Sequence, residues 1–310
     1  MKRRELFMVL GVAGEIALTN HVNASVQTPT ITKHFVTVYG QKLRYFAAGD
    51  ANRPTIVILH GLISEASDWL PNIKVLSQQF HVIALDLPGC GQSDKPSINY
   101  RIGTFVDYLH GFLQTLDRDR FSLIGHSLGA IIAINFALTY PDKVDKLVNV
   151  SGGFGYALPD ADPQMLGFTP GSLKLLNPST QAQVRQLLAL ALYDQEIAQA
   201  EETVNYVFTV ASNSGYVNGR VVELFKQGED TLDGKLSALN HPTLILWGRQ
   251  DKLTPVTLGD RFETELPNSQ LIVFEECAHN PYAEQFERFN TKVLRFLGQR
   301  DPAVKRRGFL

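Results

Sequence analysis

The sequence predicts an α/β fold: a mostly parallel, eight-stranded sheet flanked by helices, with a helical cap inserted late in the chain. Short runs rich in β-branched residues alternate with segments of helical spacing along most of the chain. Two of those runs, residues 55–59 and 81–85, are almost wholly apolar. Continuous apolar strands are typical of a parallel sheet covered on both faces, because right-handed crossover helices hide both sides from water.

Composition excludes several classes of function. The 310 residues include 29 Lys and Arg against 31 Asp and Glu. This balance argues against a general nucleic-acid binder, which needs clustered cations. Cys90 and Cys277 are the only cysteines, too few for a disulfide framework or a four-ligand zinc site, and no pair of histidines has metal-binding spacing. We therefore expect neither a nucleic-acid partner nor a metal, and both cysteines should be buried thiols.

Residues 1–30 form a leader or an N-terminal extension. Lys2, Arg3 and Arg4 precede an apolar run that ends before Glu15, and Ala24 closes a stretch that resembles a signal-peptidase site. Two interpretations stay open: a cleaved export signal, which would make the protein exported or periplasmic, and the N-terminal helix of a cytoplasmic protein. The run is shorter than the roughly 20 apolar residues that a membrane span requires, and no later run approaches that length.

The core elements follow in order along the chain. Strands are expected at residues 35–39, 43–48, 55–60, 81–85, 121–124, 146–150, 243–247 and 270–274. Helices are expected at residues 104–116, 127–140, 255–266 and 281–297. Only three residues separate the first two strands, so these should form a hairpin at a sheet edge. The core then comprises residues 31–151 and 241–298, and residues 299–310 should be a loose tail.

The alternation of strands and helices stops between these two core segments. Gly and Pro interrupt the chain repeatedly, and helical stretches follow at residues 180–193, 195–211 and 216–226 without a convincing strand. We interpret residues 152–240 as a helical cap inserted into the core. It carries ten acidic residues against five basic ones. Such a lid would repel the phosphates of a coenzyme-A thioester.

The clearest chemical motif is Gly125-His126-Ser127-Leu128-Gly129. It directly follows one expected strand and directly precedes a helical run, which is the setting of a nucleophile elbow. Small flanking residues are needed there because the serine backbone is strained and the strand and helix approach each other closely. The alternative is an ordinary turn with an N-capping serine. The placement favours Ser127 as a nucleophile above the sheet.

A serine nucleophile needs a base, and the base needs an acceptor that fixes its tautomer. Asp251 and His279 each stand just after an expected strand, and catalytic groups of open parallel sheets gather at the carboxyl ends of strands. We therefore predict the catalytic residues Ser127, Asp251 and His279. His34, His81, His110 and His241 are better explained by packing or surface positions.

The negative oxygen of a tetrahedral intermediate needs preorganised backbone donors. We predict an oxyanion hole formed by the amides of Leu62 and Leu128, the second of which begins the helix after the nucleophile. His60, Gly61 and His126 should support the site, with the side chain of His126 pointing away from the nucleophile.

Five segments together resemble the successive motifs of the capped α/β-hydrolase superfamily. They are His60-Gly61, residues 86–94, residues 125–129, residues 247–251 and His279-Asn280-Pro281. The likeness covers about residues 32–297 and implies the α/β-hydrolase fold, with residues 152–240 as its lid. Within the superfamily, the nearest resemblance is to serine esterases and to carbon–carbon bond hydrolases that cleave ring-fission products. Haloalkane dehalogenases and epoxide hydrolases carry a carboxylate where this chain has Ser127, which disfavours those activities.

These observations predict a serine hydrolase that cleaves a small to medium apolar carboxylic ester through an acyl-enzyme on Ser127, with no cofactor. Two alternatives stay open: carbon–carbon bond hydrolysis of a ring-fission product, and a small-molecule receptor that turns over slowly. The few basic residues of the cap weaken the first alternative, because a ring-fission product carries a carboxylate. Large apolar residues of the cap should either pack within it or line the pocket: Phe154, Tyr156, Met165, Leu166, Phe168, Tyr193, Tyr206, Phe208 and Tyr216. The oligomeric state stays open.

Overall fold

The computed structural model describes residues 29–153, 170–227 and 232–299. These residues form an eight-stranded sheet in the order β1-β2-β4-β3-β5-β6-β7-β8. β2 runs antiparallel to both of its neighbours, and the other pairings are parallel. The predicted mostly parallel sheet and its edge hairpin are confirmed. The strands are β1 (Thr32–Val38), β2 (Gln41–Ala48), β3 (Thr55–Leu59), β4 (His81–Leu85), β5 (Phe121–His126), β6 (Val144–Val150), β7 (Thr243–Gly248) and β8 (Ser269–Phe274).

The strand order reverses at β3, which lies between β4 and β5. All five residues of β3 and of β4 are buried, as their apolar sequences predict. From β3 the chain first moves back to β4, which lies beside β2, and then crosses to β5 on the other side of β3, with β6, β7 and β8 following in order. In sheets of this kind a crevice opens at the reversal, outside the carboxyl ends of the strands.

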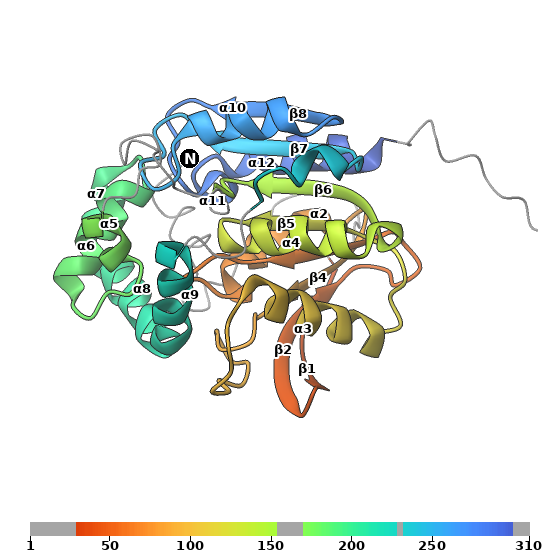
Figure 1. The fold of residues 1–310 in the computed structure, drawn as a ribbon, viewed down its shortest axis with the longest axis horizontal. Coiled ribbons are helices and arrows are strands. Elements are labelled where there is room, and N and C mark those ends of the chain that lie inside the picture. Colours follow the sequence, from red (N-terminus) through yellow and green to blue (C-terminus); the bar gives the residue numbers. More distant parts are fainter. Residues whose placement is uncertain (1–28, 154–169, 228–231, 300–310) are drawn as a thin grey trace, which may run out of the picture.

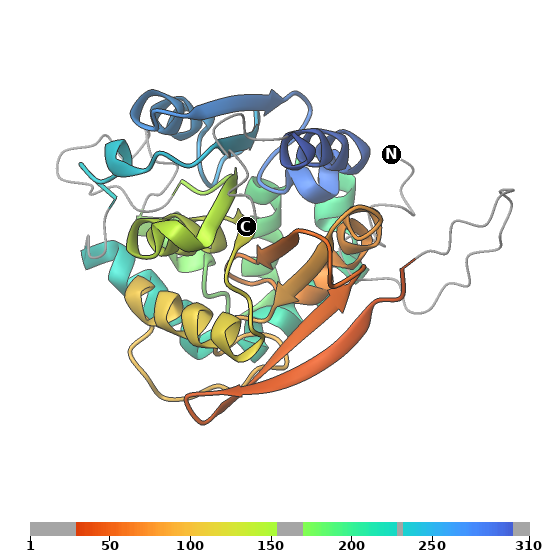
Figure 2. The same cartoon turned by 90° about the vertical axis from the view of Figure 1, so that its right-hand side faces the viewer.

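Helices cover both faces of the sheet (Figure 2). α3 (Ile102–Thr115), α4 (Leu128–Thr139) and α10 (Val256–Glu265) pack with one face, and α2 (Leu70–Leu76) and α12 (Phe286–Gly298) pack with the other. α4 is apolar around most of its surface because it is enclosed between the sheet and α3. The two apolar clusters hold the sheet rigidly, so the loops at its carboxyl edge start from fixed positions.

A helical insert lies between β6 and β7 and gathers at one end of the molecule (Figure 1). Its described helices are α5 (Pro170–Leu175), α6 (Gln181–Ala191), α7 (Gln195–Gln199), α8 (Glu201–Asn213) and α9 (Gly215–Gln227). The expected helix at residues 195–211 is two helices, because Ala200 adopts an extended backbone conformation between them. The helix expected at residues 281–297 is likewise divided at Gln285, into α11 (Pro281–Glu284) and α12.

Short elements that lack a clear periodicity were not predicted. They include α2 and the 3-10 turns η1 (Ala66–Trp69), η2 (Pro141–Lys143) and η3 (Leu236–Ala238). The expected leader, except for its last two residues, and almost all of the expected tail lie outside the described residues. In the part of the chain that the structure describes, every helix is too short or too polar to cross a membrane.

Candidate active site

Ser127 stands at the turn between β5 and α4 with φ 51° and ψ −117°. A positive φ is strained for a residue with a side chain, and it is the conformation expected of a nucleophile elbow. The flanking glycines permit it. A Cβ on Gly125 would lie 2.4 Å from Ala130 Cα, and one on Gly129 would lie 2.3 Å from the carbonyl oxygen of Leu59. Helix and strand therefore approach more closely than any larger residue allows.

The Asp251 carboxylate orients the His279 ring. His279 Nδ1 donates to Asp251 Oδ2 over 2.8 Å, which leaves Nε2 of the neutral ring as a potential base. Asp251 follows β7, and His279 lies in the loop after β8, as expected. The Asp251 side chain is fully buried and is fixed by the amides of Leu253 and Thr254, each 2.9 Å from Oδ1.

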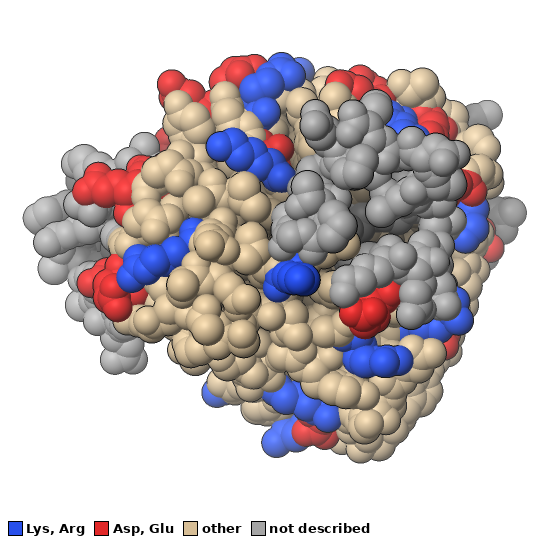
Figure 3. Space-filling model, turned by 60° about the vertical axis from the view of Figure 1, so that its left-hand side comes forward, with Lys and Arg blue, Asp and Glu red and all other residues tan. Residues whose placement is uncertain are grey.

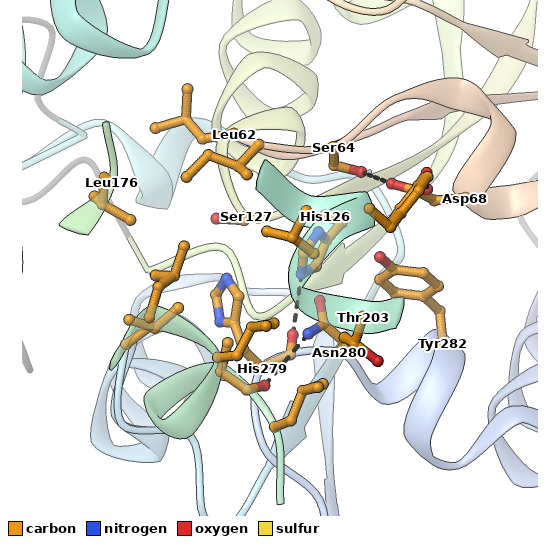
Figure 4. Close-up of a pocket in the computed structure, with 18 residues that line it drawn as sticks. Leu62, Ser64, Asp68, His126, Ser127, Leu176, Thr203, His279, Asn280 and Tyr282 are labelled. Atoms are coloured by element: carbon orange, nitrogen blue, oxygen red, sulfur yellow. Dashed lines mark hydrogen bonds between the residues drawn. The ribbon is translucent and has the colours of Figure 1, made fainter. Parts of the chain in front are cut away.

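Ser127 and His279 line one pocket, and Figure 4 shows them on the same side of it. The serine hydroxyl and the imidazole, both within the described residues, form no direct hydrogen bond in this structure. Such bonds are often loose without substrate and tighten when the carbonyl is bound. The fold thus brings the three predicted catalytic side chains to one end of the sheet, although 124 residues separate Ser127 from Asp251 in the chain.

The loop after β3 passes close to Ser127. A Cβ on Gly61 would lie 3.0 Å from Ser127 Cβ, so glycine allows this approach. His60 fixes the loop: its Nδ1 donates to the Gly61 carbonyl over 2.8 Å, and its Nε2 accepts from the Leu87 amide over 3.0 Å. Burial lowers the pKa of His60, which is consistent with this neutral form.

Leu62 and Leu128 occupy the positions predicted for the oxyanion donors. Leu128 is the first residue of α4, where backbone amides have no partner within the helix. Among the described residues, neither amide donates a hydrogen bond to another group of the protein. Both amides therefore stay candidates for the predicted role, and Leu62 lines the pocket.

His126 lines the same pocket as Ser127, and its ring contacts the loop that carries His279. Its Nε2 donates to the backbone oxygen of His279 over 3.0 Å, and the two rings lie 4.9 Å apart. Burial, with a smaller effect of His279, lowers the pKa of His126 well below its usual value. The neutral ring thus supports the loop that carries the predicted base.

The helical insert also holds that loop. The amide of His279 donates to the carbonyl of Ala191, at the end of α6, over 3.0 Å. Glu284 accepts from the amides of Tyr193, Ala278 and Asn280 over 2.7, 3.1 and 3.0 Å. Burial raises the pKa of Glu284 to about 7 despite these donors. Displacing α6 would therefore disturb the position of the imidazole.

The pocket between the insert and the core has an empty volume of about 800 Å³, including its opening. Leu62, Leu176, Leu187 and Leu188 contribute to a mostly apolar lining, and no Lys or Arg belongs to the described part of it. Such a volume and lining are typical of sites for small organic molecules. The face that carries the insert has interspersed acidic and basic side chains where described residues cover it (Figure 3).

Several polar residues of the site have no recognisable motif in the sequence. Thr254 donates to Asp251 Oδ2 or to the carbonyl of Ser151, at 2.8 and 3.1 Å. Its position just after an aspartate was the available signal, because aspartate side chains commonly hydrogen-bond the backbone of the turn that follows them. Asp68 and Thr203 line the pocket far from the predicted motifs, and nothing in the sequence marks them.

The large apolar cap residues and the two cysteines named in the sequence analysis differ in where they lie. Tyr206 lines the pocket, whereas Tyr193 and Tyr216 are exposed. Phe154, Tyr156, Met165, Leu166 and Phe168 lie outside the described residues.

Cys90 and Cys277 are free, buried thiols, and burial raises the pKa of Cys90 to about 12. Within residues 29–153, 170–227 and 232–299, His, Cys, Asp and Glu form no cluster of three that could hold a metal ion.

Comparison with known sequences identifies hydrolases, both by family model and by individual relative. The family model described as "alpha/beta hydrolase fold" matches residues 54–286. A 2-hydroxy-6-oxononadienedioate/2-hydroxy-6-oxononatrienedioate hydrolase from Paraburkholderia phymatum is 30% identical over 292 residues, covering 88% of this chain and 98% of that protein.

Solved structures show the same fold. The crystal structure of a membrane phospholipase A, described as a bacterial virulence factor, superposes with a TM-score of 0.77 and 25% identity over 86% of each chain. A 2-hydroxy-6-oxo-6-phenylhexa-2,4-dienoate hydrolase from Rhodococcus sp. strain RHA1 superposes with a TM-score of 0.75 and 24% identity, over 88% of this chain and all of that chain (100%).

Proposed function

Since this chain belongs to the α/β-hydrolase family, we propose that it is a serine hydrolase whose acyl-enzyme forms on Ser127. The observation that carries the proposal is the buried Asp251–His279 pair beside a strained serine in one pocket. We further propose that residues 31–151 and 241–298 form the catalytic core and that residues 152–240 cap it.

In the proposed reaction, Ser127 Oγ attacks the substrate carbonyl while His279 Nε2 takes the hydroxyl proton. Asp251 stabilises the imidazolium, and the amides of Leu62 and Leu128 hold the negative oxygen. His279 returns the proton to the departing atom, and the bond between that atom and the carbonyl carbon breaks. Water, activated by the same ring, then releases the acid and regenerates the serine.

Two substrate classes are candidates. The named relatives favour carbon–carbon bond hydrolysis, the alternative of the sequence analysis, over its first prediction of an ester. The pocket favours a neutral acyl group, because its described lining has no Lys or Arg to bind the two carboxylates of a nonadienedioate. We therefore propose a carbonyl substrate without a carboxylate near the site, first a vinylogous diketone and second an apolar ester.

The nucleophile is tested by labelling with a fluorophosphonate and by the Ser127→Ala variant. Labelling should occur on Ser127, and the variant should lose about 10³-fold or more of kcat, because both steps need the hydroxyl. Ser97→Ala, an exposed serine, is the matched control and should keep full activity. Labelling on another residue, or wild-type activity in the Ser127 variant, would contradict the proposal.

The substrate class is tested by parallel assays on the wild type. One follows the loss of absorbance of neutral conjugated dienol diketones, and the other follows release of p-nitrophenol from acyl esters of graded length. A kcat/KM higher for the diketones supports carbon–carbon bond hydrolysis, and the reverse supports an esterase. If neither class is consumed, the serine-hydrolase proposal fails.

A further inference from the structure

The pocket has a polar wall that the proposed acyl transfer does not use. We define the polar wall as Ser64, Asp68, Thr203 and Tyr206, all of which line the pocket. Ser64 and Asp68 come from the loop before η1 and from η1 itself, and Thr203 and Tyr206 come from α8. In Figure 4, Leu62 and Leu176 lie on the left with Ser127, and Ser64 and Asp68 lie on the right. The pocket is therefore apolar on one side and polar on the other.

Only part of the Asp68 carboxylate is occupied by the protein. Oδ2 accepts from Ser64 Oγ over 2.6 Å and from the Glu65 amide over 3.1 Å, which secures the local turn. Oδ1 accepts from the Tyr206 hydroxyl across the interface between core and insert. Each carboxylate oxygen can accept two hydrogen bonds, so Oδ1 has room for a donor that enters the pocket.

Asp68 also lacks a compensating charge. The residue is 6% exposed, and no Lys, Arg or His of the described residues forms an ion pair with it. Burial accordingly raises the pKa of Asp68 to about 7, and the hydrogen bonds from Ser64 and Tyr206 only partly oppose this effect. A buried carboxylate without a cation is costly, and a donor or a positive charge on a ligand would reduce that cost.

Thr203 provides a second, independent observation. The residue is fully buried and lines the pocket, and its buried hydroxyl has no hydrogen-bond partner among the described residues. Thr203 stands three residues before Tyr206 on α8, so both side chains are on one face of the helix. A buried hydroxyl without a partner destabilises the protein, so its place beside a cavity points to a ligand.

We propose that the polar wall is a specificity site for a hydrogen-bond donor on the substrate, either a hydroxyl or a protonated amine, remote from the reacting carbonyl. Asp68 Oδ1 and Thr203 Oγ1 accept from this donor, and Tyr206 positions the carboxylate. A carboxylate at the same end of the substrate is repelled by Asp68. This inference rests on the proposed function, because it assigns a further group of the substrate to the same pocket.

The test compares p-nitrophenyl esters that differ only at the remote end of the acyl chain. Unsubstituted, ω-hydroxy, ω-amino and ω-carboxy acyl esters are assayed over a series of chain lengths. At one length the hydroxy or the amino ester should exceed the unsubstituted ester about tenfold or more in kcat/KM, because a site built for a donor rejects analogues without one. The carboxy ester should be the poorest. The two favoured arms distinguish a hydroxyl from an ammonium group.

Two variants separate recognition from a structural role. Asp68→Asn should reduce the preference for the amino ester most, because it removes the charge while keeping the shape. We define the preference ratio as kcat/KM for the hydroxy or amino ester divided by kcat/KM for the unsubstituted ester. Thr203→Val should lower this ratio but raise Tm, because it deletes a buried hydroxyl that has no hydrogen-bond partner in the described protein. The matched controls are Asp142→Asn and Thr209→Val, both exposed residues, which should change neither the ratio nor the effect of chain length.

A preference ratio near one at every length, with turnover that still depends on Ser127, would overturn the polar wall and leave the proposed function intact. If no ester is hydrolysed, the diketone assay decides the proposed function, and the inference is decided by binding instead. Unreactive methyl ketones with the same four ends are then compared by thermal shift. A larger rise in Tm with the hydroxy or amino ketone supports the polar wall, and equal shifts reject it.

Discussion

Asp251 accepts four hydrogen bonds, from the amides of Leu253 and Thr254, from the Thr254 hydroxyl and from His279 Nδ1. All are within hydrogen-bonding distance in a fully buried position. Thr254 is placed at the centre of this network, since its Oγ1 also lies 3.2 Å from His279 Nδ1. The carboxylate is thereby held in one orientation, which in turn limits the rotation of the imidazole.

Thr254→Val should weaken this arrangement without changing side-chain volume much. We expect a loss of about 1–2 kcal/mol in the free energy of unfolding, because Asp251 loses a buried donor. We also expect kcat to fall about tenfold with KM nearly unchanged, because the ring is positioned less well for the proton transfer. Urea unfolding and steady-state kinetics measure the two effects. Thr264→Val, at an exposed position of α10, is the control, and an unchanged kcat in Thr254→Val would argue against a positioning role.

At the scale of elements, the close approach of α4 to β3 and β5 fixes the position of Ser127, the proposed nucleophile. Gly129 Cα faces the end of β3, where a Cβ would lie 2.3 Å from the oxygen of Leu59 and 2.6 Å from that of His60. Both atoms belong to a buried backbone that cannot move aside without disturbing the sheet. The same loop continues into Leu62, so a shift of β3 would also displace a predicted oxyanion donor.

Gly129→Ala should therefore destabilise the protein by about 3 kcal/mol or more, as expected for overpacking against a backbone. Gly103→Ala makes the opposite change in energy. Gly103 lies in α3, and a Cβ added to it would have no neighbouring atom within 4 Å, so alanine should stabilise that helix by about 0.5–1 kcal/mol. Urea midpoints of both variants test the pair. Similar midpoints for the two would show that helix α4 can move away from β3.

Among the described residues, burial is the main cause of the pKa shifts of five buried groups that titrate near or below neutral pH. The pKa values of His60, His81 and His126 are lowered, and those of Asp68 and Glu284 are raised to about 7. On acidification, the unfolded chain protonates its histidines below about pH 6.5, which lowers stability. The two carboxylates take up protons at a higher pH in the folded chain than in the unfolded chain, so acidification from about pH 7 to pH 4 raises stability through these groups.

The opposing effects predict a Tm that changes little from about pH 6.5 to 4.5 and falls below about pH 4, where only the histidine contribution continues. Thermal unfolding across this range measures it. Glu284→Gln removes one of the compensating groups, so its Tm should already fall on acidification from about pH 6.5. A wild-type Tm that falls steeply over the same interval would show that the carboxylates do not titrate as expected.

Local patterns were sufficient to predict most of the fold. Apolar runs identified β3 and β4, and helical spacing identified α3, α4 and α10, because both periodicities arise within a few residues of chain. The breaks at Ala200 and Gln285 were not predicted, since neither glycine nor proline marks them. They depend on how the insert and the last helix fit against the rest of the molecule.

The sequence by itself determined the nucleophile elbow and the identities of Ser127, Asp251 and His279 as candidates, because strand ends and short motifs are properties of neighbouring residues. Only the tertiary structure decided that Asp68 meets Tyr206 from 138 residues away, and that the His126 ring bonds to the backbone of His279. Contacts between the core and the insert arise from packing of surfaces that share no local pattern. Local sequence therefore identified the candidate catalytic residues, whereas the polar wall depends on contacts between the core and the insert.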